Sequence, residues 1–303
     1  MRPKTPRWVF WLVLLTTLPG CYSQLSACDP VVRLFAPASQ PLDAPIRQQL
    51  ERGIESGEAS LSHDRFDRLL SRHAAPKAGR VDYRGLARDR SELEAYLERI
   101  AEVDPADLGR DAQLALLINA YNACTLELIV DHYPGIDSIK DISDPWGRPI
   151  CTVGGADLTL DQIEHNLIRP LYKDPRIHFA VNCAAVGCPP LDDSAYRGAT
   201  IDTQLDAAAR RTLRSERYIR LEEGELKLLR ILLWYRDDFL DEQFHDSADT
   251  IPAYVAEYAT PEVGAFIDEH DGDPPIAWLE YDWSLNDLPS NSAPKNDESR
   301  PEE

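Results

Sequence analysis

The chain of 303 residues is long enough for one large domain or two small ones, and its hydrophobic share of 43% and charged share of 28% are ordinary for a globular protein. These values exclude a fibrous chain, a mostly disordered one and a membrane protein with several spans. The 32 basic and 52 acidic residues give a formal net charge of −20, which excludes nucleic-acid binding through a basic surface.

A secretory signal peptide of the lipoprotein type is predicted at residues 1–20. Three basic residues precede an apolar run over 8–15, which is too short to cross a membrane as a mature helix. The sequence Leu-Pro-Gly-Cys then ends at Cys21, in the order of a bacterial lipobox. We therefore expect a lipid on Cys21 to attach the protein to a membrane of the bacterial cell envelope. Because Tyr22 and not Asp follows, we expect the outer membrane, with the protein facing the periplasm.

One globular domain is predicted over residues 44–286. Residues 21–43 begin with the lipidated cysteine and are rich in Pro, Ala, Ser and Gln, which is typical of a flexible tether. Residues 287–303 are acidic and nearly free of apolar side chains, which predicts a disordered tail. Between these segments we find no repeat and no linker, so the chain has a single domain.

The central element of the predicted fold is a helix over 111–133. Shorter helices are expected before it, around 66–70 and 93–100, where apolar residues recur at helical spacing. The stretch over 114–130 is apolar almost all round, and Pro134 follows the last periodic residue. We therefore expect this helix to be buried in the middle of the core.

The remaining elements mix short strands with helices. A strand is expected over 150–153, a helix with a capping box at its start over 160–169, and a second strand over 176–182. A helix, a hairpin, two or three helices and a last strand follow, over 205–213, 218–221 with 225–229, 231–240, 251–258, 261–269 and 276–281. This order predicts an α+β fold: a helix-dominated single domain with a small, mainly antiparallel sheet.

Two carboxamides interrupt the apolar central helix. Asn119 and Asn122 are three residues apart, so they share one face of the helix. A buried amide without a partner costs about 1–3 kcal/mol, so both side chains need partners. Either they tie neighbouring loops to the core, or they orient a catalytic side chain or hold a substrate amide.

A Glu-His pair, Glu164 and His165, lies on the capped helix. Neighbouring residues of a helix point about 100° apart, so the two side chains would not easily hold one metal ion together. Either His165 donates to a nearby carbonyl and locks a packed helix, or it serves as a general base. A metal site formed by His165 and His178 is a minor alternative.

The densest polar segment runs from Pro175 to Pro190. On a strand, alternation places His178 and Asn182 on one face and Cys183 on the other, so strand geometry alone gives no His178–Cys183 pair. Either the strand ends before Cys183, or Cys183 takes its base from elsewhere, with His165 nearest in sequence.

Cys183 and Cys188 are five residues apart across a turn that contains glycine and is followed by two prolines. Three interpretations remain open: a structural disulfide, a free buried thiol, or a reactive thiolate that includes the case of a redox-active pair. A nucleophilic thiolate needs a pKa lowered by a nearby histidine or helix N-terminus.

Several motifs occur together in a fixed order. Leu-Ile-Asn-Ala-Tyr-Asn-Ala at 117–123 resembles the signature of the family catalogued as domain of unknown function 547. Further blocks agree with that family at 81–83, 153–155, 160–165, 174–183 with 188–190, and 281–286. The resemblance covers about residues 80–286. Cys124 stands where the family has an aliphatic residue. The resemblance implies no settled activity.

Two functions from different classes follow. The first is a thiol-dependent acyl transferase or amide or peptide hydrolase, by analogy with papain-like and transglutaminase-like folds, acting on an envelope peptide or protein. In this hypothesis Cys183 is the nucleophile and its sulfur lies within about 4 Å of a histidine nitrogen. The second is a non-catalytic envelope scaffold or binding lipoprotein with a structural Cys183–Cys188 disulfide. The sequence contains no motif for a cofactor or a metal. The candidate catalytic residues are Cys183, His178, His165, Glu164, Asn119, Asn122 and Asn182.

Overall fold

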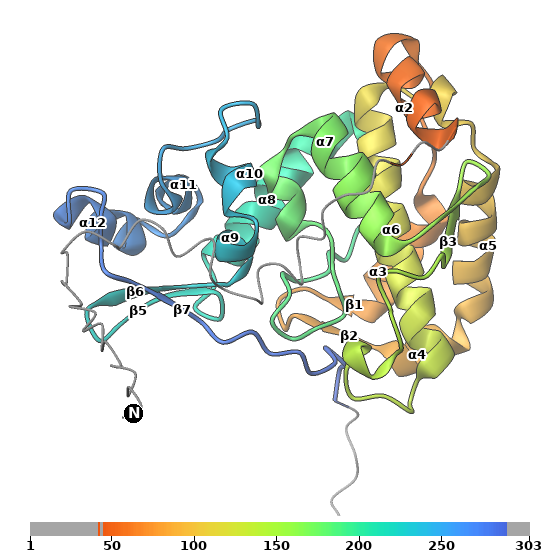
Figure 1. Cartoon of the computed structure of the whole chain (residues 1–303). Coiled ribbons are helices and arrows are strands. Elements are labelled where there is room, and N and C mark those ends of the chain that lie inside the picture. The colour runs from red at the N-terminus through yellow and green to blue at the C-terminus, as the bar shows by residue number, and fades with distance from the viewer. Residues whose placement is uncertain (1–41, 43–44, 290–303) are drawn as a thin grey trace, which may run out of the picture. The chain divides into compact units, whose positions relative to one another are not determined.

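A long helix, α6 (Arg110–His132), stands among the other elements in the computed structural model, which describes residues 42 and 45–289 (Figure 1). Among the described helices, α6 alone is long and apolar enough to span a membrane, and 94% of its most apolar stretch is buried inside the protein. It is therefore the core helix that the apolar run predicted, and its ends agree with the expected ones within a residue. The predicted signal peptide and Cys21 lie outside the described residues.

The elements before α6 pack along one side of it. Helix α5 packs on both α6 and strand β3, while α2 packs on α6 and on the turn η2. Their amphipathic patterns explain this, because the buried residues of each helix recur every three or four positions. The elements are α2 (Pro45–Ser56), α3 (Asp64–His73), β1 (Ala74–Ala75), β2 (Arg80–Val81), α4 (Tyr83–Arg88), α5 (Arg90–Glu102) and η2 (Pro105–Asp107).

The chain that follows α6 forms a short hairpin and a π-helix. The capping box predicted at Thr159 and Gln162 is confirmed: the Thr159 amide donates to Gln162 Oε1 at 2.9 Å and the Gln162 amide donates to Thr159 Oγ1 at 3.0 Å. The expected helix over 160–169 follows, but most of it is wound as a π-helix. The elements are η3 (Ile139–Asp141), β3 (Cys151–Val153), β4 (Ala156–Leu158), the π-helix η4 (Gln162–Ile168), α7 (Arg169–Tyr172) and η5 (Pro175–Phe179).

The strand expected over 176–182 is wrong. Residues Pro175–Phe179 form the 3₁₀-helix η5, which begins where the Asp174 side chain accepts a hydrogen bond from the Arg176 amide at 3.0 Å. Proline at the first position of η5 suits a helical start, since its missing N–H needs no partner there. The alternation that separated His178 from Cys183 therefore does not apply.

The last third of the chain contains the largest sheet. The predicted hairpin is confirmed as β5 and β6, which pair antiparallel, and β7 adds to β6 in parallel. The single helix expected over 231–240 is instead two short helices that meet at Tyr235. The elements are η6 (Gly198–Thr200), α8 (Ile201–Leu213), β5 (Ile219–Glu222), β6 (Glu225–Leu228), α9 (Ile231–Trp234), α10 (Arg236–Leu240), α11 (Ile251–Tyr258), α12 (Pro261–Glu269) and β7 (Ile276–Trp278).

After β7 the chain returns to the core (Figure 1). Leu285 pairs with Ala185 in an isolated antiparallel bridge, and Asp287 pairs with Val81 in a parallel one. The described part of the chain therefore has dominant helices with three small, mostly antiparallel sheets. Its closing segment touches both strand β2 and the loop that carries Cys183.

Candidate functional site around Cys183

The loop that carries Cys183 is held by two asparagines. Asn122 on α6 donates to the Ala180 carbonyl at 2.9 Å and accepts from the Asn182 amide at 2.8 Å. Asn182 in turn donates to the Pro189 carbonyl at 2.8 Å and accepts from the Ala184 amide at 3.0 Å. The side-chain amide of each asparagine thus donates one hydrogen bond to the loop backbone and accepts one from it. The two residues together fix the shape of the loop.

Asn119 serves a different loop. It donates to the Tyr196 carbonyl at 2.8 Å and accepts from the Tyr196 amide at 2.9 Å. The shared helix face of Asn119 and Asn122 is thus used to clamp two separate segments, and the prediction that both carboxamides need partners is confirmed. Neither side chain contacts the sulfur of Cys183.

The closing segment forms one wall of the site. The Val186 amide donates to the Ser284 carbonyl at 2.9 Å, and the Gly187 amide donates to the Asp282 carbonyl at 2.8 Å. A Cβ at Gly187 would lie 2.9 Å from the Asp282 nitrogen and 3.1 Å from the Tyr281 ring, so only glycine allows this close approach. The approach brings Tyr281 to the cysteine loop.

The two cysteines of the loop are close but not bonded. Cys183 Sγ lies 3.1 Å from Cys188 Sγ and 3.1 Å from Tyr281 Oη, and the Cys183 amide donates to Cys188 Sγ at 3.1 Å. Both are free thiols, with Cys183 half-buried and Cys188 buried. The structural disulfide considered for Cys183 and Cys188 is therefore not present in this structure.

The pKa values of the two thiols are shifted in opposite directions. Hydrogen bonds from Cys188 and then Tyr281 lower the pKa of Cys183, although burial opposes them. Burial, and then the neighbouring Cys183, raise the pKa of Cys188 well above its ordinary value. Cys183 is therefore the thiol that more readily becomes a thiolate, the form in which sulfur acts as a nucleophile.

A buried charged network lies on the elements next to this loop. Asp238 of α10 accepts two hydrogen bonds from Arg169, at 2.6 and 2.7 Å, and one from His178 Nε2 at 2.8 Å. Burial opposes ionisation of Asp238, but these hydrogen bonds outweigh it and lower the pKa of its carboxyl. Burial lowers the pKa of His178, although the hydrogen bond that its Nε2 donates to Asp238 opposes this shift.

Glu164 completes the network from the π-helix. Its Oε1 lies 3.8 Å from His178 Nδ1, and the Tyr235 hydroxyl donates to its carboxylate. The His178 ring also stacks on Tyr235, with 3.9 Å between ring centroids. Burial works against ionisation of Glu164, yet its pKa is lowered by His165, His178 and Tyr235. A buried carboxylate is thus kept charged, and it raises the pKa of Cys183 electrostatically.

The predicted site residues fall into three groups. Cys183 and its loop anchors Asn122 and Asn182 lie together, Glu164 and His178 belong to the charged network, and Asn119 lies apart. His165 Nδ1 contacts Arg169 Nη1 at 3.2 Å. In the described part of the chain Cys183 has no hydrogen bond to a histidine, so the histidine contact expected for a cysteine–histidine pair is not present.

Sequence reasoning missed several residues of the site. Tyr281 stands in the closing motif that resembles the known family, but its pattern carries no chemical signal. Asp238, Arg169 and Tyr235 lie in segments assigned only as helices. Over the residues that the structure describes, no group of three or more His, Cys, Asp or Glu side chains could hold a metal ion.

A disulfide does occur elsewhere in the core. Cys124 of α6 is bonded to Cys151 of β3, with 5.6 Å between their Cα atoms and a sequence separation of 27 positions. Cys124 lies in the apolar stretch over 114–130 that we expected to be buried, and it is only 1% exposed. Its covalent partner was not predicted, because the pairing depends on how β3 packs against α6.

Comparisons with known proteins give one match. Residues 105–213 match the family model described as "Protein of unknown function, DUF547". This range contains α6, the π-helix, the cysteine loop and α8, whereas Tyr235, Asp238 and Tyr281 lie outside it. No curated protein and no solved structure matches the chain significantly. From its own motifs and from this match, the chain carries a DUF547 domain at residues 105–213.

Proposed function

We propose that this protein carries out thiol–disulfide exchange through Cys183 and Cys188, as a lipoprotein held at the bacterial cell envelope by a lipid on Cys21. The observation that carries the proposal is the pair of free sulfurs 3.1 Å apart, one half-buried and one buried. A disulfide bond is about 2.05 Å long, so a movement of about 1 Å would join them.

The different acidities of the two thiols support distinct roles. The half-buried Cys183, whose pKa is lowered, suits the thiol that attacks a substrate disulfide. The buried Cys188, whose pKa is raised, stays protonated until its partner is engaged. An asymmetric pair of this kind favours attack from the accessible sulfur and resolution by the buried one.

The reaction balances without another reagent. The Cys183 thiolate attacks one sulfur of the substrate disulfide, that S–S bond breaks, and the other substrate sulfur leaves as a thiolate. The leaving thiolate takes a proton from Cys188, whose sulfur then attacks Cys183 Sγ and releases the second substrate sulfur as a thiolate. The substrate disulfide is reduced by two electrons, and Cys183 and Cys188 are oxidised to a disulfide. The reverse sequence oxidises a substrate dithiol.

Aromatic side chains beside Cys183 support a polypeptide substrate. The Tyr281 ring centroid lies 4.8 Å from that of Trp234 and 4.5 Å from that of Trp283. Tyr281 itself reaches Cys183 through its hydroxyl. Aromatic surfaces with polar edges are common where proteins bind other polypeptides, since they bury much area with few rotatable bonds. We infer that a cysteine-bearing segment of an envelope protein would lie across the half-buried rings of Tyr281 and Trp283.

The bonded pair in the core supports an oxidising location. Disulfides form and persist in the periplasm and are rare in the bacterial cytosol. The Cys124–Cys151 bond is thus consistent with the envelope location proposed from the lipobox at Cys21.

A second candidate is thiol-dependent acyl transfer or amide hydrolysis, by analogy with papain-like and transglutaminase-like enzymes. The buried Glu164, His178 and Asp238 favour it, because a carboxylate–histidine pair is a common base in such reactions. However, the leaving amine would need a proton from a group next to Cys183, and the hydrogen-bond partners of Cys183 among the described residues are Cys188 and Tyr281. The redox function therefore has the stronger geometric support.

The test uses the mature protein and a peptide that contains one disulfide. Wild-type protein should reduce the peptide in the presence of dithiothreitol faster than dithiothreitol alone. Cys183→Ser should abolish this acceleration. Cys188→Ser, incubated with the peptide without dithiothreitol, should accumulate a mixed disulfide between Cys183 and the peptide, seen as added mass. Acceleration that survives Cys183→Ser, or no trapped adduct in Cys188→Ser, would contradict the proposal. Hydrolysis of an amide substrate that depends on both Cys183 and His178 would favour the second candidate instead.

A further inference from the structure

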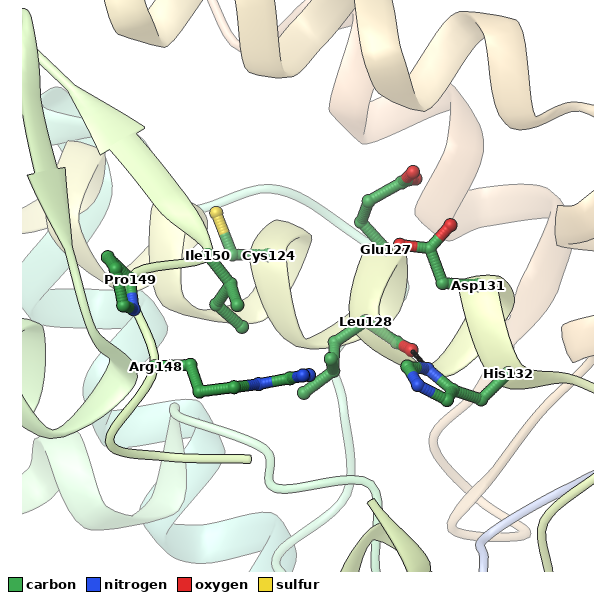
Figure 2. A pocket seen from close by; sticks show the side chains of 8 residues that line it. All are labelled: Cys124, Glu127, Leu128, Asp131, His132, Arg148, Pro149 and Ile150. Carbon is green, nitrogen blue, oxygen red and sulfur yellow. Dashed lines mark hydrogen bonds between the residues drawn. The ribbon is translucent and has the colours of Figure 1, made fainter. Parts of the chain in front are cut away.

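A separate pocket lies between the C-terminal half of α6 and the loop that leads into β3 (Figure 2). Its volume is about 430 Å³, within the usual range for sites that bind small molecules. Cys124 lines it, and the disulfide from Cys124 to Cys151 ties the loop wall to the helix wall. Neither Cys183 nor Cys188 borders this pocket.

One wall of the pocket offers an unpaired positive group. Arg148 extends from its loop towards Leu128 of α6 (Figure 2). Its Nε is buried and has no hydrogen-bond partner among the described residues. A buried donor without a partner is unfavourable, and more so when the group is charged. A carboxylate is the natural partner for a guanidinium, which it can meet with two parallel hydrogen bonds.

The helix wall offers unpaired acceptors. Glu127 and Asp131 lie side by side on α6, and both bond to the single guanidinium of Arg90 (Figure 2). Glu127 Oε2 is buried and, within the described residues, has no hydrogen-bond partner. His132 Nδ1 donates to the Leu128 carbonyl at 2.8 Å, and in that tautomer Nε2 is an acceptor. Because Glu127 and Asp131 share one arginine, this wall carries a net negative charge.

The charges of the two walls limit the class of ligand. A phosphate or another polyanion would meet Arg148 but be repelled by Glu127 and Asp131. A simple amine would meet the acids but leave Arg148 unpaired. We propose that this pocket binds a small zwitterion, an amino acid or a short peptide, with its carboxylate on Arg148 and its ammonium group on Glu127. This site is independent of the exchange reaction at Cys183.

The test is a calorimetric titration of the mature protein with the dipeptide alanyl-alanine, beside acetate, methylamine and inorganic phosphate. The dipeptide should bind, and each of the other three should bind at least about tenfold more weakly, because each lacks one of the two charged groups or repels the acids. No binding of the dipeptide up to about 10 mM, or equal binding of phosphate, would overturn the proposal.

Variants locate the binding. Arg148→Gln should weaken dipeptide binding at least about tenfold, since it removes a charged hydrogen bond, and Glu127→Gln should weaken it similarly. Arg52→Gln, a change at an exposed position of α2 outside the pocket, should leave binding unchanged. Thermal unfolding of each variant confirms folding. Because Arg148 Nε has no hydrogen-bond partner among the described residues, Arg148→Gln should unfold like the wild type. Undiminished binding to folded Arg148→Gln protein would overturn the assignment.

Discussion

The two cysteine pairs of this protein differ in bonding, in burial and in their surroundings. Cys124 and Cys151 are bonded, almost completely buried, and join two elements of the core. Cys183 and Cys188 are unbonded at 3.1 Å, lie in one short loop, and differ from each other in burial and in pKa. The first pair thus cross-links two elements of the fold, and the second consists of two free thiols with different environments.

The surroundings of the two pairs explain the contrast. Cys124 and Cys151 pack in the hydrophobic core, and Cys151 Sγ has only a distant backbone contact, 3.7 Å from the Ala120 carbonyl. Cys183 instead has a second thiol and a tyrosine hydroxyl beside it, and both lower its pKa. Polar neighbours that stabilise a thiolate occur at the second pair and not at the first.

The largest expected effect concerns stability. Replacing both Cys124 and Cys151 by alanine should lower the free energy of unfolding by about 3 kcal/mol, since the disulfide closes a segment of 27 residues. Replacing both Cys183 and Cys188 by alanine should cost about 1 kcal/mol or less, because no covalent link is lost. Denaturant unfolding in a glutathione buffer that keeps the second pair reduced measures both. Equal losses would erase the distinction between the pairs.

The next effect separates loop anchoring from general stability. Asn122→Ala leaves the Ala180 carbonyl and the Asn182 amide without partners, and should cost about 2 kcal/mol and change the rate at which iodoacetamide labels Cys183. Asn119→Ala is the matched control: it removes two similar bonds on the same helix and should cost as much without altering the labelling. Identical labelling rates in the two variants would show that Asn122 does not position the thiol.

The helix that carries both asparagines shows how much of the structure can be predicted from the sequence. Its bounds, the hairpin of β5 and β6, and the capping box at Thr159 all follow from local patterns, and the structure confirms them. The need of Asn119 and Asn122 for partners also follows, because it depends only on their place in an apolar helix.

What the sequence could not predict depends on contacts between distant segments. Cys124 finds Cys151 only when β3 lies on α6, and Tyr281 reaches Cys183 only because the closing segment crosses the chain at Gly187. The strand expected over 176–182 fails for a local reason: a proline and the Asp174 cap begin a 3₁₀-helix. Polar and apolar residues alternate over 176–182, and this alternation led to the incorrect prediction of a strand.

A smaller effect concerns the acidity of Cys183. Its pKa is lowered by hydrogen bonds from Cys188 and Tyr281, so removing either donor should raise the pKa. In Cys188→Ala, and less so in Tyr281→Phe, the pH at which alkylation of Cys183 is half-maximal should therefore rise, and labelling at pH 7 should slow several-fold. Tyr218→Phe is the control, because its hydroxyl donates to the Cys188 carbonyl and not to a sulfur. A midpoint that stays in place in Cys188→Ala would contradict the assigned cause.

The smallest expected effect lies in the backbone of the cysteine loop. Ala184 has φ of +61°, a conformation that costs a residue with a Cβ but not glycine. Ala184→Gly should therefore stabilise the protein by less than about 1 kcal/mol, because the glycine also adds freedom to the unfolded chain. Ala185→Gly, at a neighbouring position without positive φ, should destabilise it. Thermal unfolding measures both, and a marked loss of stability in Ala184→Gly would contradict this account.

The most direct test of the central claim is a redox titration of the mature protein in glutathione buffers, followed by alkylation and mass mapping. We predict that the peptides bearing Cys183 and Cys188 lose two daltons together and reversibly as the buffer becomes more oxidising, while Cys124 and Cys151 stay bonded throughout. If Cys183 and Cys188 remain alkylated at every ratio, or if Cys124 and Cys151 are the pair that opens and closes, the assignment of a reactive and a structural pair is wrong.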